Sequence, residues 1–146
     1  ANVHGNCTWI MAYPGETLKD LQTSVAFITW QQDFWTKGTT RGSSEYERMR
    51  SGVNRKMFTA TAYPGTEMWK VVKPQLQEHF DISFNTFGQP ECDENFHHYV
   101  SELDDATKIL NDKNGNPVNF GELSLDTFLQ AREHIDNDEI EKILDI

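Results

Sequence analysis

One stretch of the chain, residues 56–88, constrains the fold most, because it predicts a strand, a helix and a second strand in direct succession. The apolar and Thr-rich run at 57–63 is typical of a strand. Pro64-Gly65 ends that strand, since proline has no N–H for a sheet and glycine tolerates positive φ. Alternating apolar and polar residues at 81–87 predict the second strand. Between the two strands, apolar residues at spacings of three and four predict a helix with one buried face: Met68, Trp69, Val72, Leu76 and Phe80.

The four residues Ala-Tyr-Pro-Gly occur twice, at 12–15 and at 62–65. Each copy follows a strand-like run, the first of which is 7–13, and each precedes a helical pattern. The residues at 24–30 are β-branched and aromatic enough to leave a strand as an alternative to the first helix. Two related strand–Pro-Gly–helix units explain the repeat, and so does chance identity, because the flanking residues match poorly.

The last third of the chain predicts helices. The apolar period over 96–110 indicates a helix of about four turns. Ser124 is a good N-cap for a second helix, and Asp136 followed by Glu139 resembles a capping box that would open a third. Together with the two strand–Pro-Gly–helix units, these helices predict an α+β fold, with α/β as the alternative.

The length of 146 residues fits a single compact domain that spans 1–146. Nine Phe, four Trp and four Tyr supply large buried areas to its core. We expect a small sheet built from the strand–Pro-Gly–helix units, with the C-terminal helices packed on it.

Charge is distributed unevenly. The net charge is −10; residues 1–60 carry seven basic and five acidic side chains, and residues 61–146 carry six basic and eighteen acidic ones. This polarity predicts a protein partner or self-association, and the acidic excess argues against nucleic acid as a partner. The sequence has no apolar run long enough to cross a membrane, and its two cysteines fit a reducing cytoplasm.

The segment 37–56 is predicted to be a basic loop rich in Gly and Ser. Its candidate binding residues are Arg41, Tyr46, Arg48, Arg50 and Arg55. Phosphate binding by these arginines would be opposed by the acidic remainder of the chain. Two other roles are left: the loop docks on acidic helices of a neighbouring copy, or it folds back on the acidic C-terminal helices of its own chain.

Two thiols and several imidazoles form a candidate zinc site. His4, Cys7, Cys92 and His97 are the ligand types that tetrahedral zinc prefers, and His98 lies beside them in the sequence. Cys92 is also a candidate nucleophile, although its acidic neighbours stabilise the thiol over the thiolate. The plainer interpretation is that these residues are unrelated, and we expect no cofactor.

The sequence contains no phosphate-binding loop, no dinucleotide-binding glycine motif and no nucleophile elbow. We therefore expect a non-catalytic protein–protein interaction or assembly subunit, such as a viral structural or accessory protein, which uses a basic loop and an acidic helical surface (91–146). One alternative is an acidic inhibitor that occupies a nucleic-acid-binding site of a host protein. The other is a small zinc-binding protein or an enzyme that depends on Cys and His.

Overall fold

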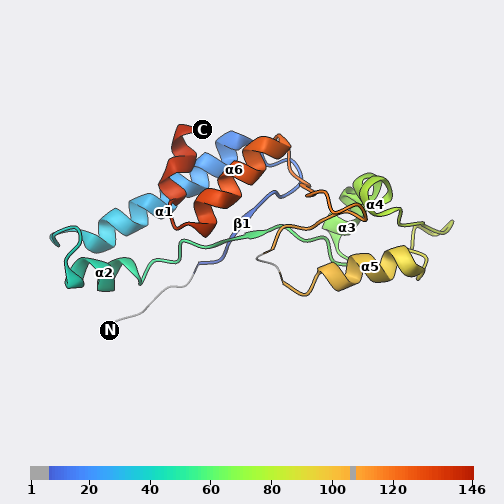
Figure 1. Cartoon of the computed structure of the whole chain (residues 1–146), viewed down its shortest axis with the longest axis horizontal. Helices are drawn as coiled ribbons and strands as arrows, with labels where there is room; N and C mark the ends of the chain where they lie inside the picture. Colours follow the sequence, from blue (N-terminus) through green and yellow to red (C-terminus); the bar gives the residue numbers. More distant parts are fainter. Residues whose placement is uncertain (1–6, 106–107) are drawn as a thin grey trace.

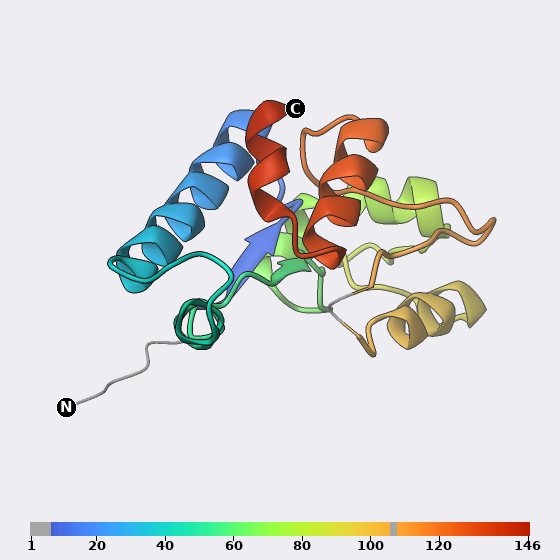
Figure 2. The same cartoon turned by 60° about the vertical axis from the view of Figure 1, so that its left-hand side comes forward.

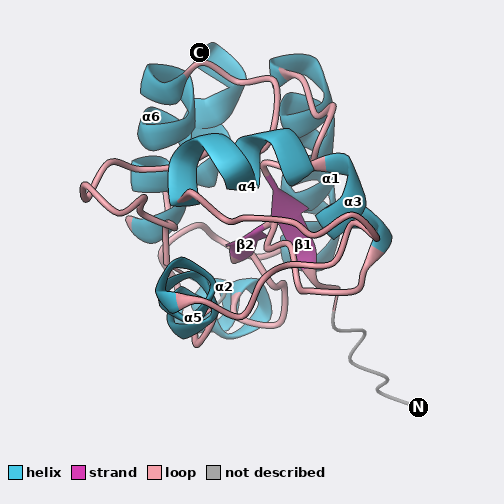
Figure 3. Cartoon of the chain, turned by 90° about the vertical axis from the view of Figure 1, so that its right-hand side faces the viewer, coloured by secondary structure: helices cyan, strands magenta, loops and turns pink. Residues whose placement is uncertain are grey.

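Two short parallel strands lie at the centre of the computed structural model, which describes residues 7–105 and 108–146. Strand β1 (Trp9–Met11) pairs with β2 (Met57–Thr59) (Figure 3). In this pairing Ile10 lies opposite Phe58. Met11 and Met57 face the interior, whereas Ile10 lies on the exposed side. The predicted strands at 7–13 and 57–63 are therefore present, but each is shorter than predicted and ends before the Pro-Gly turn that follows it.

The two Ala-Tyr-Pro-Gly segments adopt the same turn. In each, the residue after the glycine donates its N–H to the tyrosine carbonyl oxygen, over 2.8 Å in the first turn and 3.2 Å in the second. The glycines have φ of 86° and 88°, which only glycine adopts without strain. Both alanines are buried and both tyrosines are exposed. The repeat in the sequence is thus a repeat in local structure.

The first turn leads into α1 (Leu18–Thr36). A capping box formed by Thr17 and Asp20 begins this helix. A second helix, α2 (Ser44–Arg50), occupies the segment predicted to be a loop. Ser43 caps it, acidic residues lie in its first turn and arginines in its last, so its charges suit the helix dipole. The prediction of a continuous loop at 37–56 is wrong for this part.

The second turn leads into α3 (Glu67–Val71) and α4 (Lys73–Phe80), which divide the predicted helix at Val72. The division follows from Pro74, whose ring is tolerated only in the first turn of a new helix. The predicted strand at 81–87 is wrong. Only one antiparallel bridge, between Phe84 and Pro90, forms there, because the chain reverses in a tight turn at Gly88.

Helix α5 (Glu94–Glu102) is shorter than the predicted helix at 96–110. Leu110 instead accepts a hydrogen bond from the N–H of Val118 over 2.8 Å, in a hairpin closed around Asn114-Gly115. The predicted Ser124 cap is confirmed at the start of α6 (Leu125–Asp136).

The last element, η1 (Ile140–Asp145), is a 3₁₀ helix without a side-chain cap. Asp136 belongs to the end of α6 and pairs with Arg132, so the capping box predicted for Asp136 and Glu139 is wrong. Arg132 is buried, and its Nη1 donates to the carbonyl oxygen of Met57 over 2.7 Å. It therefore ties α6 to β2.

Two groups of helices follow one another along the long axis of the molecule (Figure 1), and each encloses one apolar cluster. The first cluster is enclosed by α1, α6 and η1, and the second by α3, α4 and α5. The predicted α+β class, with a small sheet and C-terminal helices, is confirmed. None of the helices within the described residues combines the length and the apolar character that a membrane span requires.

Backbone segments of the two turns are held by close contacts with later parts of the chain. The hydroxyl of the buried Tyr99 donates to the carbonyl oxygen of Ala62 over 2.6 Å. At the first turn, a Cβ placed on Gly121 would lie 3.2 Å from both Ala12 Cα and the Tyr13 carbonyl oxygen. A Cβ at 121 would be unusually close to its neighbours, which are backbone atoms and would have to shift by a few tenths of an ångström to make room for it.

We expect Gly121→Ala to destabilise the fold by about 1–3 kcal/mol, the usual cost of overpacking a close contact. Urea denaturation measures this change in the free energy of unfolding. Glu122→Ala is the control, because Glu122 is exposed and its side chain can be removed without adding an atom near the turn. Equal stability of the two variants would contradict the close contact.

Candidate interaction surface

Three aromatic side chains form a continuous exposed row on α1. Phe27, Trp30 and Phe34 are 47%, 58% and 65% exposed. The ring centroid of Trp30 lies 5.4 Å from that of Phe27 and 5.9 Å from that of Phe34. Trp9 of β1 extends the contact, with its centroid 5.8 Å from Phe27. We call Phe27, Trp30 and Phe34 the aromatic row.

The aromatic row lies on the opposite side of α1 from the residues that build the first cluster. Leu21, Val25 and Ile28 are fully buried there. Single exposed apolar residues are ordinary on protein surfaces, but large rings in contact with one another are not. Helix α1 therefore has two apolar faces, of which the described structure covers one.

The sequence carried a signal for this surface. Positions 27, 30 and 34 have the spacing of a helical face, and they fall outside the stripe that begins with Leu18 and Leu21. Two of them, Phe27 and Trp30, contributed to the ambiguity of 24–30 between helix and strand. Two separate apolar stripes on one helix indicate one face for the core and one for something else.

The basic residues of 37–56 divide into two groups. Arg55 is only 8% exposed, and its Nε donates to Asp138 Oδ1 over 2.7 Å while its Nη2 donates to Glu141 Oε2 over 2.6 Å. Gln32 of α1 accepts a further hydrogen bond from Arg55 Nη1. Arg50 Nη2 reaches the second oxygen of Asp138 over 2.6 Å. We call these five residues the arginine cluster.

The arginine cluster joins the basic segment to the acidic end of its own chain. For Arg50 and Arg55 this geometry matches the second predicted role, in which the segment folds back on the C-terminal helices. Partial burial raises the pKa of Asp138 and Glu141, but the hydrogen bonds from Arg50 and Arg55 outweigh it and leave both pKa values lowered. The carboxylates are therefore charged at neutral pH.

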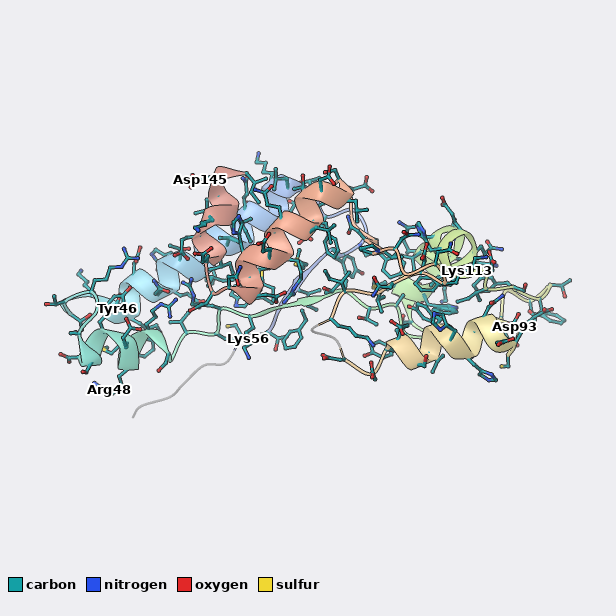
Figure 4. The ribbon with its side chains drawn as sticks, viewed as in Figure 1. Tyr46, Arg48, Lys56, Asp93, Lys113 and Asp145 are labelled. Atoms are coloured by element: carbon teal, nitrogen blue, oxygen red, sulfur yellow. The ribbon has the colours of Figure 1, made fainter. Side chains whose placement is uncertain are left out.

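Arg41 and Arg48 are exposed and Tyr46 is half-buried. Within the described residues, neither Arg41 nor Arg48 forms a salt bridge. Figure 4 shows Tyr46 and Arg48 at one end of the molecule and Asp93, at the start of α5, at the other. The basic residues that are free to meet a partner thus lie far from the acidic start of α5.

The described part of the candidate zinc site does not converge. Cys7 lies just before β1. Cys92 lies just before α5 and His97 lies in the first turn of that helix. All three residues are exposed. His98 is exposed beside them, and His4 lies outside the described residues. Among residues 7–105 and 108–146, no group of three or more His, Cys, Asp or Glu side chains could hold a metal ion.

The exposed side of the sheet forms an open groove of about 380 Å³. It is lined by Ile10, Phe58 and Tyr63 together with small residues at 59–61, and its surface is mostly apolar. Catalytic pockets bring a few convergent polar groups together within an apolar enclosure. The lining of this groove holds hydroxyl groups but no carboxylate, imidazole or amine.

The arginine cluster predicts a specific pH dependence. Because the folded-state pKa values of Asp138 and Glu141 lie below their unfolded values, the stability from the cluster is present above about pH 5. It is lost as the pH falls through the lowered folded-state values. We expect Arg55→Gln to lose stability at pH 7 and to show a shallower decline between pH 5 and about pH 3 than the wild type, measured by urea denaturation.

Lys56→Gln is the matched control, since it removes a neighbouring positive charge that is exposed. It should preserve the acid dependence of the wild type. An Arg55→Gln variant with the wild-type pH profile would contradict the role of the cluster.

The expectation of no cofactor is tested by native mass spectrometry. The mass after buffer exchange should equal the polypeptide mass, because no three or more ligand side chains among residues 7–105 and 108–146 gather into a site for a metal ion. Stoichiometric zinc that is lost in Cys92→Ser or His4→Ala would establish the site predicted from the sequence instead.

The chain was also compared with known proteins. No protein-family model, no curated protein and no solved structure matches it. The indication of its function therefore comes from its own surfaces, among which the aromatic row combines large exposed rings that contact one another.

Proposed function

We propose that this protein acts by binding other protein molecules through the aromatic row on α1, without catalysis of its own. The observation that carries the proposal is the contact of three large rings with one another while about half or more of each remains exposed. Tryptophan and other aromatic residues are enriched at the centres of protein interfaces. This role belongs to the class predicted from the sequence, an interaction or assembly subunit, but it uses a different surface.

The magnitude of the apolar term supports a binding role. Each ring would bury roughly 75–125 Å² on contact, which is half of the area that such side chains bury in a core. At about 25 cal/mol per Å², three rings contribute roughly 6–9 kcal/mol before the cost of association. That cost is of the same size, so the row needs polar neighbours or further area for tight binding.

Several neighbours can supply that contribution. Three exposed charged residues on α1 and one at its C-cap balance in charge: Lys19, Asp20, Asp33 and Lys37. A protein surface with mixed charges can match them, whereas a polyanion would meet the acidic excess of the whole chain. Arg41 and Arg48 lie beyond the C-terminal end of α1 and could contribute at the rim of the interface.

A photo-crosslinking experiment tests the proposal. Phe34 is replaced by p-benzoylphenylalanine, which keeps an aromatic ring in the row, and the chain is irradiated in an extract of its source. We expect a discrete protein adduct, formed either with another protein or with a second copy of the chain.

Phe87 is the matched control, because it is 88% exposed and lies outside the aromatic row, in the turn before Gly88. The same probe at 87 should give no comparable adduct. Indistinguishable labelling from positions 34 and 87 would rule out the aromatic row as a docking surface.

A further inference from the structure

The aromatic row is the middle of a longer stripe along α1, which ends at the C-cap residue Lys37. Six exposed residues follow one another at spacings of three, four, three, four and three positions, the spacing of a coiled-coil seam. We call them the α1 stripe: Asp20, Thr23, Phe27, Trp30, Phe34 and Lys37. Figure 2 shows α1 at the outer side of the molecule, next to η1, so one long side of the helix is open.

The order of residues in the α1 stripe is self-complementary. When two copies of α1 run in opposite directions, position 20 meets 37, position 23 meets 34 and position 27 meets 30. Each aromatic residue near the centre then meets an aromatic residue, and each acidic end meets a basic end. A two-fold symmetric contact requires this kind of match, because both copies use the same surface.

We propose that the protein forms a two-fold symmetric dimer in which the α1 stripes of two copies pack antiparallel. The inference rests on the proposed function and names the partner as a second copy of this chain. Phe27 of one copy packs against Trp30 of the other on either side of the symmetry axis, and Phe34 packs over Thr23.

The charges at the ends decide the direction of the helices. In the antiparallel dimer Asp20 of each copy lies near Lys37 of the other, which gives two ion pairs. A parallel arrangement would place Asp20 beside Asp20 and Lys37 beside Lys37. Such like-charge contacts oppose association.

The carboxylate of Asp20 is held in place and charged by local hydrogen bonds. Its Oδ2 accepts hydrogen bonds from the Thr17 N–H over 3.0 Å and the Thr17 hydroxyl over 2.6 Å. These bonds lower its pKa and keep the carboxylate charged. Its Oδ1 has no hydrogen-bond partner within the described residues and can accept one from Lys37 of a second copy.

The area fits a reversible dimer. Three half-exposed rings from each copy bury roughly 450–750 Å² in total. Asp20, Thr23 and Lys37 of both copies bring the contact close to the roughly 1,000 Å² that a specific interface needs. We therefore expect dissociation constants of about 1–100 μM, which lie in the range of small, transient interfaces.

Sedimentation equilibrium of the purified chain across this concentration range tests dimer formation. Phe34→Ala removes two rings per dimer and should weaken dimerisation at least about thirtyfold. Phe87→Ala makes the same change at an exposed phenylalanine outside the stripe and should leave it unchanged. A chain that stays monomeric, or a dimer that responds equally to both substitutions, overturns the proposal.

A charge substitution tests the ends of the stripe. Lys37→Glu places a second acid beside Asp20 at both ends and should weaken dimerisation between about two- and thirtyfold. Lys56→Glu makes the same change in charge at an exposed lysine elsewhere and should have little effect. Equal effects would show that net charge, and not this contact, governs association.

Crosslinking of the purified chain tests the direction. With p-benzoylphenylalanine at 34, the antiparallel dimer should attach to residues 20–24 of the other copy, identified by peptide mass spectrometry. Attachment at 31–37 would indicate parallel helices and overturn the arrangement. In the antiparallel dimer two copies of position 34 lie about 16 Å apart along the helix axis, too far for direct attachment.

The two proposals can fail separately. A purified chain that stays monomeric, while position 34 still captures another protein in the extract, rejects the dimer and supports protein binding. Absence of any adduct from position 34 in either sample rejects both.

Discussion

The parallel pairing of β1 with β2 is the contact on which the rest of the structure depends. Each strand has three residues, and each opens a unit in which the same Pro-Gly turn leads into helices. Because parallel strands point the same way, both turns emerge at the same end of the sheet. The helix of the first unit then packs in one apolar cluster with α6 and η1, and the helices of the second unit pack in the other with α5 and the hairpin at 110–118. So small a sheet would not be stable by itself, and the helices packed around both units supply the missing burial.

The elements that could be predicted from the sequence are those fixed by neighbouring residues. Pro64-Gly65 forms the turn after β2 and Ser124 begins α6, because a turn and a cap depend on a few adjacent atoms. The prediction that the helix continues beyond residue 102 was wrong, because Leu110 pairs with Val118 in a hairpin. The apolar period of the sequence does not reveal that pairing. Arg55 illustrates the same limit for the site. The sequence left two roles open for it, docking on a neighbouring copy or folding back on the C-terminal helices. Its partners Asp138 and Glu141 come from the other end of the chain, so local sequence could not decide between them.

The aromatic row was overlooked for a different reason. An apolar residue on a helix is normally assigned to the core, and α1 already had a core face in Leu21, Val25 and Ile28. The second face becomes visible only when the exposure of each residue is known. The α1 stripe is the face of the helix that the fold leaves exposed. In the proposed dimer the charges at its two ends favour antiparallel over parallel packing of the two helices.

The hydrogen bond from Arg132 to Met57 has a consequence for solubility. The outward carbonyl groups of a sheet edge attract strands from other molecules, and this is a common route to aggregation. On β2 both such groups are already engaged, that of Met57 by Arg132 and that of Thr59 by the hydroxyl of Thr61. A growing fibril would have to displace a buried guanidinium before it could add a strand on this side. The contact that fastens α6 to the sheet thus also occupies an acceptor that an added strand would need.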